Sequence, residues 1–211
     1  MNTIMFDLDG TLLDSMLMWK NLGANFLRRK NLKITDAVIK EMSTMSLVMS
    51  SAFLKDYYNL PESSEEIHRQ FKDTVMYFYL NEVMPKVGAF EVLKQYKNLG
   101  KKVLLATATN EEFVQPTLDK FGIYNCFDGI YTSDMVGEKK DSPNFFNKIL
   151  EKENLSSKST LLFDDSEFAL LAAKKSGIKT CCVIDQHSIA NYEMLKKECD
   201  FYIEEFTEWV V

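Results

Sequence analysis

Four short runs of apolar residues stand out along the chain, and each is followed at once by a polar residue. The runs and the residues that follow them are Thr3–Phe6 before Asp7, Lys102–Ala106 before Thr107, Thr160–Phe163 before Asp164, and Thr180–Ile184 before Asp185. Continuous apolar runs of this length are typical of strands buried on both faces of a parallel sheet. The pattern therefore predicts buried strands that end at polar side chains.

Segments with helical spacing of apolar residues separate these runs. They are Ala89–Asn98, Glu111–Phe121, Pro143–Glu153 and Glu167–Ser176. Ser142 before Pro143 is a typical helix start. Alternation of strands and helices predicts an α/β fold with a doubly wound parallel sheet. Ligands of such sheets bind at the carboxyl ends of the strands, where Asp7, Thr107 and Asp164 are expected to meet.

Residues 15–84 interrupt this alternation, because they contain helix-forming segments and no clear strand. The helical segments are Trp19–Lys30, Asp36–Met42, Leu47–Tyr57 and Ser64–Leu80. Thr35 and Ser63 resemble helix N-caps, and Glu66 follows Ser63 at the spacing of a capping box. The sequence therefore predicts two domains: an α/β core formed by residues 1–14 and 85–211, and an inserted helical domain formed by residues 15–84.

Composition narrows the class of protein. Hydrophobic residues make up 46% of the 211 residues and charged residues 27%, which is typical of a globular chain. The net charge of −6 disfavours binding to nucleic acid. No apolar run approaches the roughly 20 residues that span a bilayer, and the N-terminus lacks the features of a signal peptide. The four cysteines form no CxxC pair. We expect a cytoplasmic protein without membrane contact or an obligate protein partner.

The segment Asp7-Leu8-Asp9-Gly10-Thr11 is the strongest chemical signal. Two carboxylates two residues apart after a strand can divide the work of phosphoryl transfer, one attacking phosphorus and the other handling the proton of the leaving group. Gly10 allows the backbone to turn sharply, so that both carboxylates face one pocket. The alternative is a plain strand-to-turn junction, where Asp and Gly are common.

Further polar residues fit the same chemistry. The Thr107 hydroxyl and the Ala108 N–H can bind a phosphoryl oxygen, and Lys140 can neutralise negative charge, with Lys139 as the alternative. Asp164 and Asp165 suit Mg²⁺, which prefers oxygen ligands. Each feature also has a plain structural reading: a threonine favoured in strands, a solvated lysine, or an Asp-Ser helix cap.

These motifs resemble those of the haloacid dehalogenase superfamily, in particular its phosphatase branch with a small α-helical cap, similar to phosphoglycolate phosphatase and β-phosphoglucomutase. DLDGTLLDS resembles the first motif, and the strand ending at Thr107 resembles the second. Lys140, with Pro143 and Phe146 behind it, resembles the third, and Asp164-Asp165 resembles the fourth. The resemblance covers nearly the whole chain and identifies the helical insert as a cap.

The resemblance implies a Mg²⁺-dependent phosphatase that acts on a small phosphorylated metabolite. Asp7 would be the nucleophile that is transiently phosphorylated, Asp9 the general acid and base, and Thr107, Ala108 and Lys140 the phosphate-binding groups. Asp7, Asp9 through its backbone carbonyl, Asp165, and Asp164 directly or through water would hold the metal. The presence of Asp9 points away from the dehalogenases, which lack the second aspartate, and no cap lysine stands out as in the phosphonate-cleaving members.

Two alternative functions remain open. Sugar-phosphate mutases of the family usually carry a His where this chain has Trp19, and an arginine in the cap where it runs from Met42 to Leu47. A binding module that kept the scaffold and lost activity is the second alternative, although all the motif acids are present. The sequence does not identify the substrate.

Overall fold

The computed structural model describes residues 1–42, 45–188 and 190–211. The chain divides into two compact units, one formed by Met1–Met16 with Val83–Val211 and the other by Leu17–Glu82. The junctions lie at 16/17 and 82/83, two residues from the expected positions at 14/15 and 84/85. The larger unit contains the sheet, and the smaller unit is helical.

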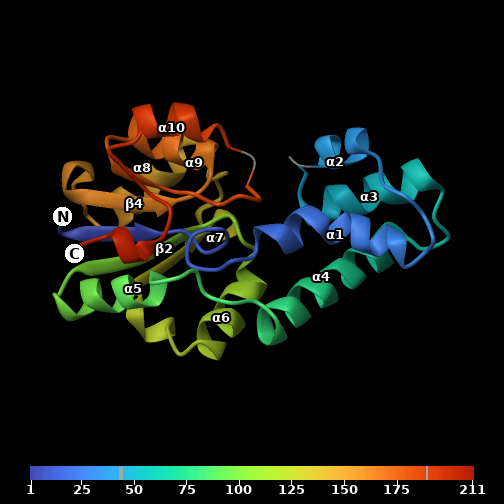
Figure 1. Cartoon of the computed structure of the whole chain (residues 1–211), viewed down its shortest axis with the longest axis horizontal. Coiled ribbons are helices and arrows are strands. Elements are labelled where there is room, and N and C mark those ends of the chain that lie inside the picture. The colour runs from blue at the N-terminus through green and yellow to red at the C-terminus, as the bar shows by residue number, and fades with distance from the viewer. Residues whose placement is uncertain (43–44, 189) are drawn as a thin grey trace. The chain divides into compact units, whose positions relative to one another are not determined.

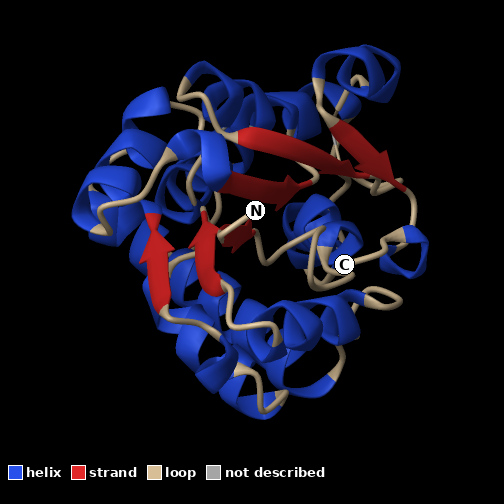
Figure 2. Cartoon of the chain, turned by 90° about the vertical axis from the view of Figure 1, so that its left-hand side faces the viewer, coloured by secondary structure: helices blue, strands red, loops and turns tan. Residues whose placement is uncertain are grey.

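The described residues of the larger unit form one sheet of six parallel strands in the order β3-β2-β1-β4-β5-β6. The strands are β1 Thr3–Phe6, β2 Lys102–Thr107, β3 Gly129–Thr132, β4 Thr160–Asp164, β5 Lys179–Val183 and β6 Phe201–Ile203. Figure 2 shows these strands with helices on both sides. The predicted α/β fold with a doubly wound parallel sheet is confirmed.

All four predicted strands are present, as β1, β2, β4 and β5, and β5 begins and ends one residue earlier than expected. The outer strands β3 and β6 were not predicted. The first two residues of β3 are half-buried and those of β6 are exposed. β3 begins with a glycine and β6 has only three residues, so neither forms a buried apolar run as long as those of the predicted strands. Edge strands are short and are buried less completely than central ones, and their sequence signal is correspondingly weak.

Helices cover both faces of the sheet. The helices of the larger unit are α5 Ala89–Asn98, α6 Glu111–Lys120, α7 Ser133–Val136, α8 Pro143–Lys152, α9 Glu167–Lys175 and α10 Tyr192–Glu198. In Figure 1, α8, α9 and α10 lie on one side of the strands and α5 and α6 on the other. α8 begins as predicted, because the Ser142 hydroxyl accepts a hydrogen bond from the Asn144 N–H at 3.2 Å and Pro143 is the first helical residue.

The central strand β1 packs against a different core on each of its faces. Phe6 stacks on Phe163 of β4 with ring centroids 5.0 Å apart, and Tyr96 and Phe206 surround this pair. Met5 points the other way, because side chains alternate along a strand, into the cluster that includes residues of α8 and α9. Burial on both faces fixes β1 firmly, and therefore fixes the position of the residue that follows it.

The smaller unit consists of helices packed around their own apolar core. The helices are α1 Met16–Arg28, α2 Asp36–Met42, α3 Leu47–Tyr58 and α4 Ser64–Asn81. Phe26 of α1 meets Phe71 of α4 edge to face at 5.2 Å. The capping box predicted at Ser63 is confirmed, since its hydroxyl accepts from the Glu66 N–H while the Glu66 carboxylate accepts from the Ser63 N–H. The segment compared with the mutase arginine includes Ser43 and Thr44, which lie outside the described residues.

No helix in the described part of the chain combines the length and the apolar character needed to cross a membrane.

Candidate active site

Asp7 and Asp164 lie side by side at the carboxyl edge of the sheet. Asp7 directly follows β1, Asp164 is the last residue of β4, and these neighbouring strands run in register with Phe6 beside Phe163. The Asp7 N–H donates to the Phe163 carbonyl at 3.0 Å, which ties the start of the loop to β4. The sheet therefore places two carboxylates from distant parts of the chain next to each other.

Asp165 completes a buried cluster of three carboxylates. One oxygen each of Asp7, Asp164 and Asp165 lies within 4.8 Å of the others, a spacing that allows one metal ion to be shared. The three residues expose only 7%, 0% and 2% of their surface. Buried carboxylates need a compensating cation, because desolvation makes isolated buried charge very costly.

Lys140 provides one such cation. Its Nζ lies 2.7 Å from Asp7 Oδ1 and 2.6 Å from Asp164 Oδ2, and its side chain is buried. Burial alone lowers the pKa of Lys140, but the carboxylates of Asp164 and Asp7 outweigh it and hold the pKa above its usual value. Lys139, the alternative considered from sequence, is exposed. The geometry therefore brings Lys140, and not Lys139, into the cluster.

The cluster still carries more negative charge than one ammonium group can balance. Burial raises the pKa of Asp164 to about 7, with Lys140 opposing and Asp7 adding to the effect. Burial, together with the carboxylates of Asp164 and Asp7, raises the pKa of Asp165 well above its usual value. A divalent cation would offset the repulsion between the ionised carboxylates and the cost of burying their charge. Carboxylate oxygens are also the ligands that hard cations prefer. The residues therefore fit a divalent metal.

The Asp9 carboxylate is held by two hydroxyl groups. Ser15 Oγ donates to Asp9 Oδ1 at 2.5 Å, and Thr109 Oγ1 donates to Asp9 Oδ2 at 2.6 Å. Asp9 is half-buried, whereas the three carboxylates of the cluster are buried. Greater access to solvent suits a group that exchanges a proton with substrate and water.

Thr107 joins the site through Thr109. Thr107 is the last residue of β2 and is buried, its Oγ1 lies 2.9 Å from Thr109 Oγ1, and it accepts from the Thr109 N–H at 3.2 Å. Ala108, whose N–H was expected to bind a phosphoryl oxygen, is exposed between them. The loop after β2 thus presents a hydroxyl of Thr107 and the backbone of Ala108 at the same edge of the sheet as Asp7.

The orientation of Asp165 depends on three residues around it. Thr11 Oγ1 donates to Asp165 Oδ1 at 3.3 Å, and the Ser188 hydroxyl donates to Oδ2. Gly10 has a φ of +76°, and a Cβ added there would lie 2.3 Å from Asp165 Oδ2. A side chain at position 10 would therefore collide with the carboxylate, which gives the glycine of the first motif a second reason beyond the turn.

Three of these contact residues, Ser15, Thr109 and Ser188, were not singled out from the sequence. Thr109 carries a weak signal, since a second hydroxyl two residues after a strand-end threonine can reach back to it. Ser188 carries none, because it lies 23 residues from its partner in the loop after β5.

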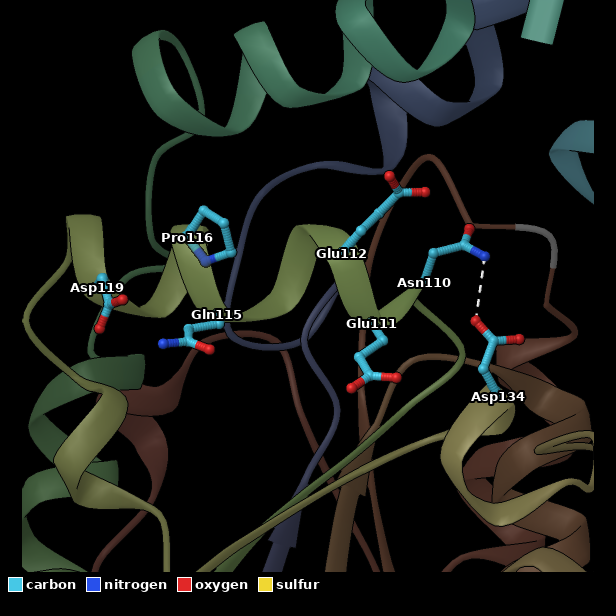
Figure 3. A pocket seen from close by; sticks show the side chains of 7 residues that line it. All are labelled: Asn110, Glu111, Glu112, Gln115, Pro116, Asp119 and Asp134. Carbon is cyan, nitrogen blue, oxygen red and sulfur yellow. Dashed lines mark hydrogen bonds between the residues drawn. The ribbon is translucent and has the colours of Figure 1, made fainter. Parts of the chain in front are cut away.

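An open hollow of about 780 Å³ lies at the start of α6, where Asn110 follows Thr109 in the chain. Its lining residues are Asn110, Glu111, Glu112, Gln115, Pro116, Asp119 and Asp134. Figure 3 shows Asn110 donating to Asp134, at 3.3 Å. Among the described residues, the lining holds four carboxylates and no cationic side chain. This side of the sheet edge is therefore negatively charged.

Comparison with known proteins identifies the family of this chain. The family model described as haloacid dehalogenase-like hydrolase matches residues 4–183. A phosphoglycolate phosphatase from Vibrio vulnificus is 28% identical over 183 residues, which cover 82% of this chain and 79% of that protein. A phosphorylated carbohydrates phosphatase from Thermotoga maritima is 25% identical over 187 residues, covering 85% of this chain and 83% of that protein.

Solved structures share the fold. CbbY from Rhodobacter sphaeroides, in complex with xylulose-(1,5)bisphosphate, superposes with a TM-score of 0.80 at 21% identity, covering 98% of this chain and 95% of that one. A putative beta-phosphoglucomutase from Thermotoga maritima gives a TM-score of 0.80 at 20% identity, covering 96% and 94%. At these identities the likeness concerns the fold.

The fold, the acidic edge of the sheet and the phosphatase relatives define a hydrolase that acts on phosphoric monoesters. The chain belongs to the haloacid dehalogenase-like hydrolase family, and the resemblance read from its four motifs is confirmed.

Proposed function

We propose that the protein is a Mg²⁺-dependent phosphatase that hydrolyses a small phosphorylated metabolite through a phosphoaspartate at Asp7. One observation carries this proposal: carboxylate oxygens of Asp7, Asp164 and Asp165 lie within 4.8 Å of one another, and the Lys140 ammonium forms ion pairs with Asp7 and Asp164. The relatives named for phosphoglycolate and for phosphorylated carbohydrates support a small phosphorylated substrate.

In the first step a carboxylate oxygen of Asp7 attacks phosphorus. The bond from phosphorus to the leaving oxygen breaks, and Asp9 delivers a proton to that oxygen. In the second step Asp9 takes a proton from water, the water oxygen bonds to phosphorus, and the bond to Asp7 breaks. Inorganic phosphate leaves, and both aspartates return to their starting states.

The remaining residues bind and orient the phosphoryl group. Lys140 offsets its negative charge, and the Thr107 hydroxyl and the Ala108 N–H donate to its oxygens. Asp7, Asp165 and the Asp9 backbone carbonyl would hold Mg²⁺, with Asp164 bound directly or through water. When bound, the ion supplies positive charge between the carboxylates and the phosphoryl group.

The helical unit, residues 17–82, is proposed to act as a cap that limits access of water and selects the leaving group. Its independent packing supports this role, because a unit with its own core can move as one body. The cytoplasmic location stays a prediction from the sequence.

Replacing Asp7 tests the nucleophile. Asp7→Asn is expected to lower release of p-nitrophenol from p-nitrophenyl phosphate, measured with Mg²⁺, by at least about 10³-fold, because the amide is not nucleophilic. Asp119→Asn makes the same chemical change on the exposed face of α6 and should retain activity. Chelating the metal with EDTA should remove the activity of the unaltered enzyme.

Asp7→Asn activity close to that of Asp119→Asn would refute the assignment. Release of inorganic phosphate without an added sugar bisphosphate distinguishes hydrolysis from a mutase reaction, which needs such a primer.

A further inference from the structure

Thr109 is a buried hydroxyl residue between two groups of the proposed mechanism. It exposes 6% of its surface and follows the end of β2 by two residues. Its Oγ1 donates to Asp9 Oδ2 at 2.6 Å and lies 2.9 Å from Thr107 Oγ1. Asp9 is the proposed proton donor, and Thr107 is a proposed phosphoryl-binding group.

The direction of these hydrogen bonds follows from the number of protons. A threonine hydroxyl has one proton, and an ionised carboxylate can only accept. Because the Thr109 proton goes to Asp9, the Thr109 oxygen is left to accept from the Thr107 hydroxyl. The Thr109 N–H in turn donates to Thr107 Oγ1 at 3.2 Å. Before substrate binds, the order is therefore Thr107 to Thr109 to Asp9; a bound phosphoryl oxygen would accept the Thr107 hydroxyl hydrogen bond in place of Thr109, which stays linked to Thr107 through its N–H.

We propose that Thr109 is a positioning residue that orients Asp9 for proton transfer and fixes it relative to the phosphoryl-binding Thr107. This inference rests on the proposed function and adds a residue to it. Thr109 donates to Oδ2 and Ser15 donates to Oδ1, so the two hydroxyl groups together fix the orientation of the carboxyl group that delivers the proton to the leaving oxygen.

The requirement for this proton depends on the leaving group. p-Nitrophenolate is a stable anion and departs with little help, whereas phenolate is more basic and needs protonation as its bond to phosphorus breaks. Phenyl phosphate and p-nitrophenyl phosphate are otherwise alike in size and charge. The ratio of their kcat/KM values therefore reports how well Asp9 delivers its proton, since kcat/KM covers the steps up to departure of the leaving group.

The test compares Thr109→Val, which keeps the shape and removes the hydroxyl, with Thr109→Ser, which keeps the hydroxyl. General acid catalysis contributes about 10²- to 10⁴-fold, and misplacing the acid should forfeit part of it. We expect Thr109→Val to lower kcat/KM for phenyl phosphate about 10-fold more than for p-nitrophenyl phosphate. Thr109→Ser should restore the ratio of the unaltered enzyme.

Thr117→Val is the matched control. Thr117 is also a fully buried threonine, but its hydroxyl donates to the Phe113 carbonyl within α6, at 2.6 Å. This variant should be less stable, but the ratio of its kcat/KM values for the two substrates should not change. Circular dichroism and thermal melting establish that each variant is folded before its rates are compared.

The role of Thr109 would be overturned if Thr109→Val lowered kcat/KM equally for the two substrates. It would also be overturned if Thr109→Ser gave the same ratio of kcat/KM values as Thr109→Val. Either result leaves the proposed function standing as long as Asp7→Asn is inactive. An active Asp7→Asn variant would instead overturn the proposed function, and the inference about Thr109 with it.

Discussion

At the scale of single residues, the buried carboxylates of Asp164 and Asp165 explain why this site needs a cation. Desolvation and neighbouring carboxylates raise the pKa of both groups, and the Lys140 ammonium and the hydrogen bonds from the Ser166 N–H and the Ser188 hydroxyl oppose this without cancelling it. Lys140 cannot neutralise three carboxylates, so one further positive ion is needed for all of them to be ionised together.

Magnesium binding should therefore depend on pH. Because the pKa of Asp164 is raised to about 7, that group carries a proton at pH 6 that Mg²⁺ must displace, and the raised pKa of Asp165 acts in the same direction. The affinity for Mg²⁺ is expected to rise from pH 6 to pH 8, with protons released on binding. Calorimetric titration in two buffers of different ionisation enthalpy measures both quantities. An affinity that stays constant over this range would contradict the account.

At the scale of elements, the loop after β5 links the site to Lys86, which lies where the chain re-enters the larger unit. Lys86 Nζ lies 2.7 Å from Asp185 Oδ2 and donates to the Ile184 carbonyl at 3.1 Å. Asp185 Oδ1 accepts from the N–H groups of His187 and Ser188. Asp185 thereby shapes the loop that brings Ser188 to the Asp165 carboxylate.

Removing the charge of Lys86 should destabilise the fold. Lys86→Met leaves the Asp185 carboxylate, which is 2% exposed, without its counter-charge, and is expected to lower the free energy of unfolding by about 3 kcal/mol. Lys148→Met is the control, since its ion pair with Glu138 is half exposed and should cost below about 1 kcal/mol. Urea denaturation measures the change in the free energy of unfolding for both variants. A loss for Lys86→Met no larger than that for Lys148→Met would contradict the structural role of the pair.

The elements also show what the sequence could predict. Runs such as Thr3–Phe6 are apolar because both faces of the strand are buried, so their ends at Asp7 and Asp164 could be placed in advance. The edge strand β6 is apolar too, but it has only three residues and the first two are exposed, so it is too short to stand out in the sequence. The contact of Ser188 with Asp165 depends on a loop conformation, and neither propensity nor periodicity encodes it.

At the scale of the whole molecule, the chain carries a net charge of −6 and has an acidic hollow beside the site. A phosphorylated substrate is repelled by such a surface at long range, so local positive charge has to attract it. Lys140 and the metal that the carboxylates fit provide that charge. The α/β unit therefore gathers the proposed chemistry at one edge of its sheet, from segments more than 150 residues apart, as in the bond from Thr11 to Asp165.

The central claim is that Asp7 becomes phosphorylated during turnover. The direct measurement mixes the enzyme with p-nitrophenyl phosphate and Mg²⁺, quenches with acid within the first turnover, reduces acyl phosphates with borohydride and maps the peptides by mass spectrometry. The account predicts reductive modification at Asp7 only, dependent on substrate and absent from Asp7→Asn. Modification at a different carboxylate, or at none while p-nitrophenol is released, would contradict it.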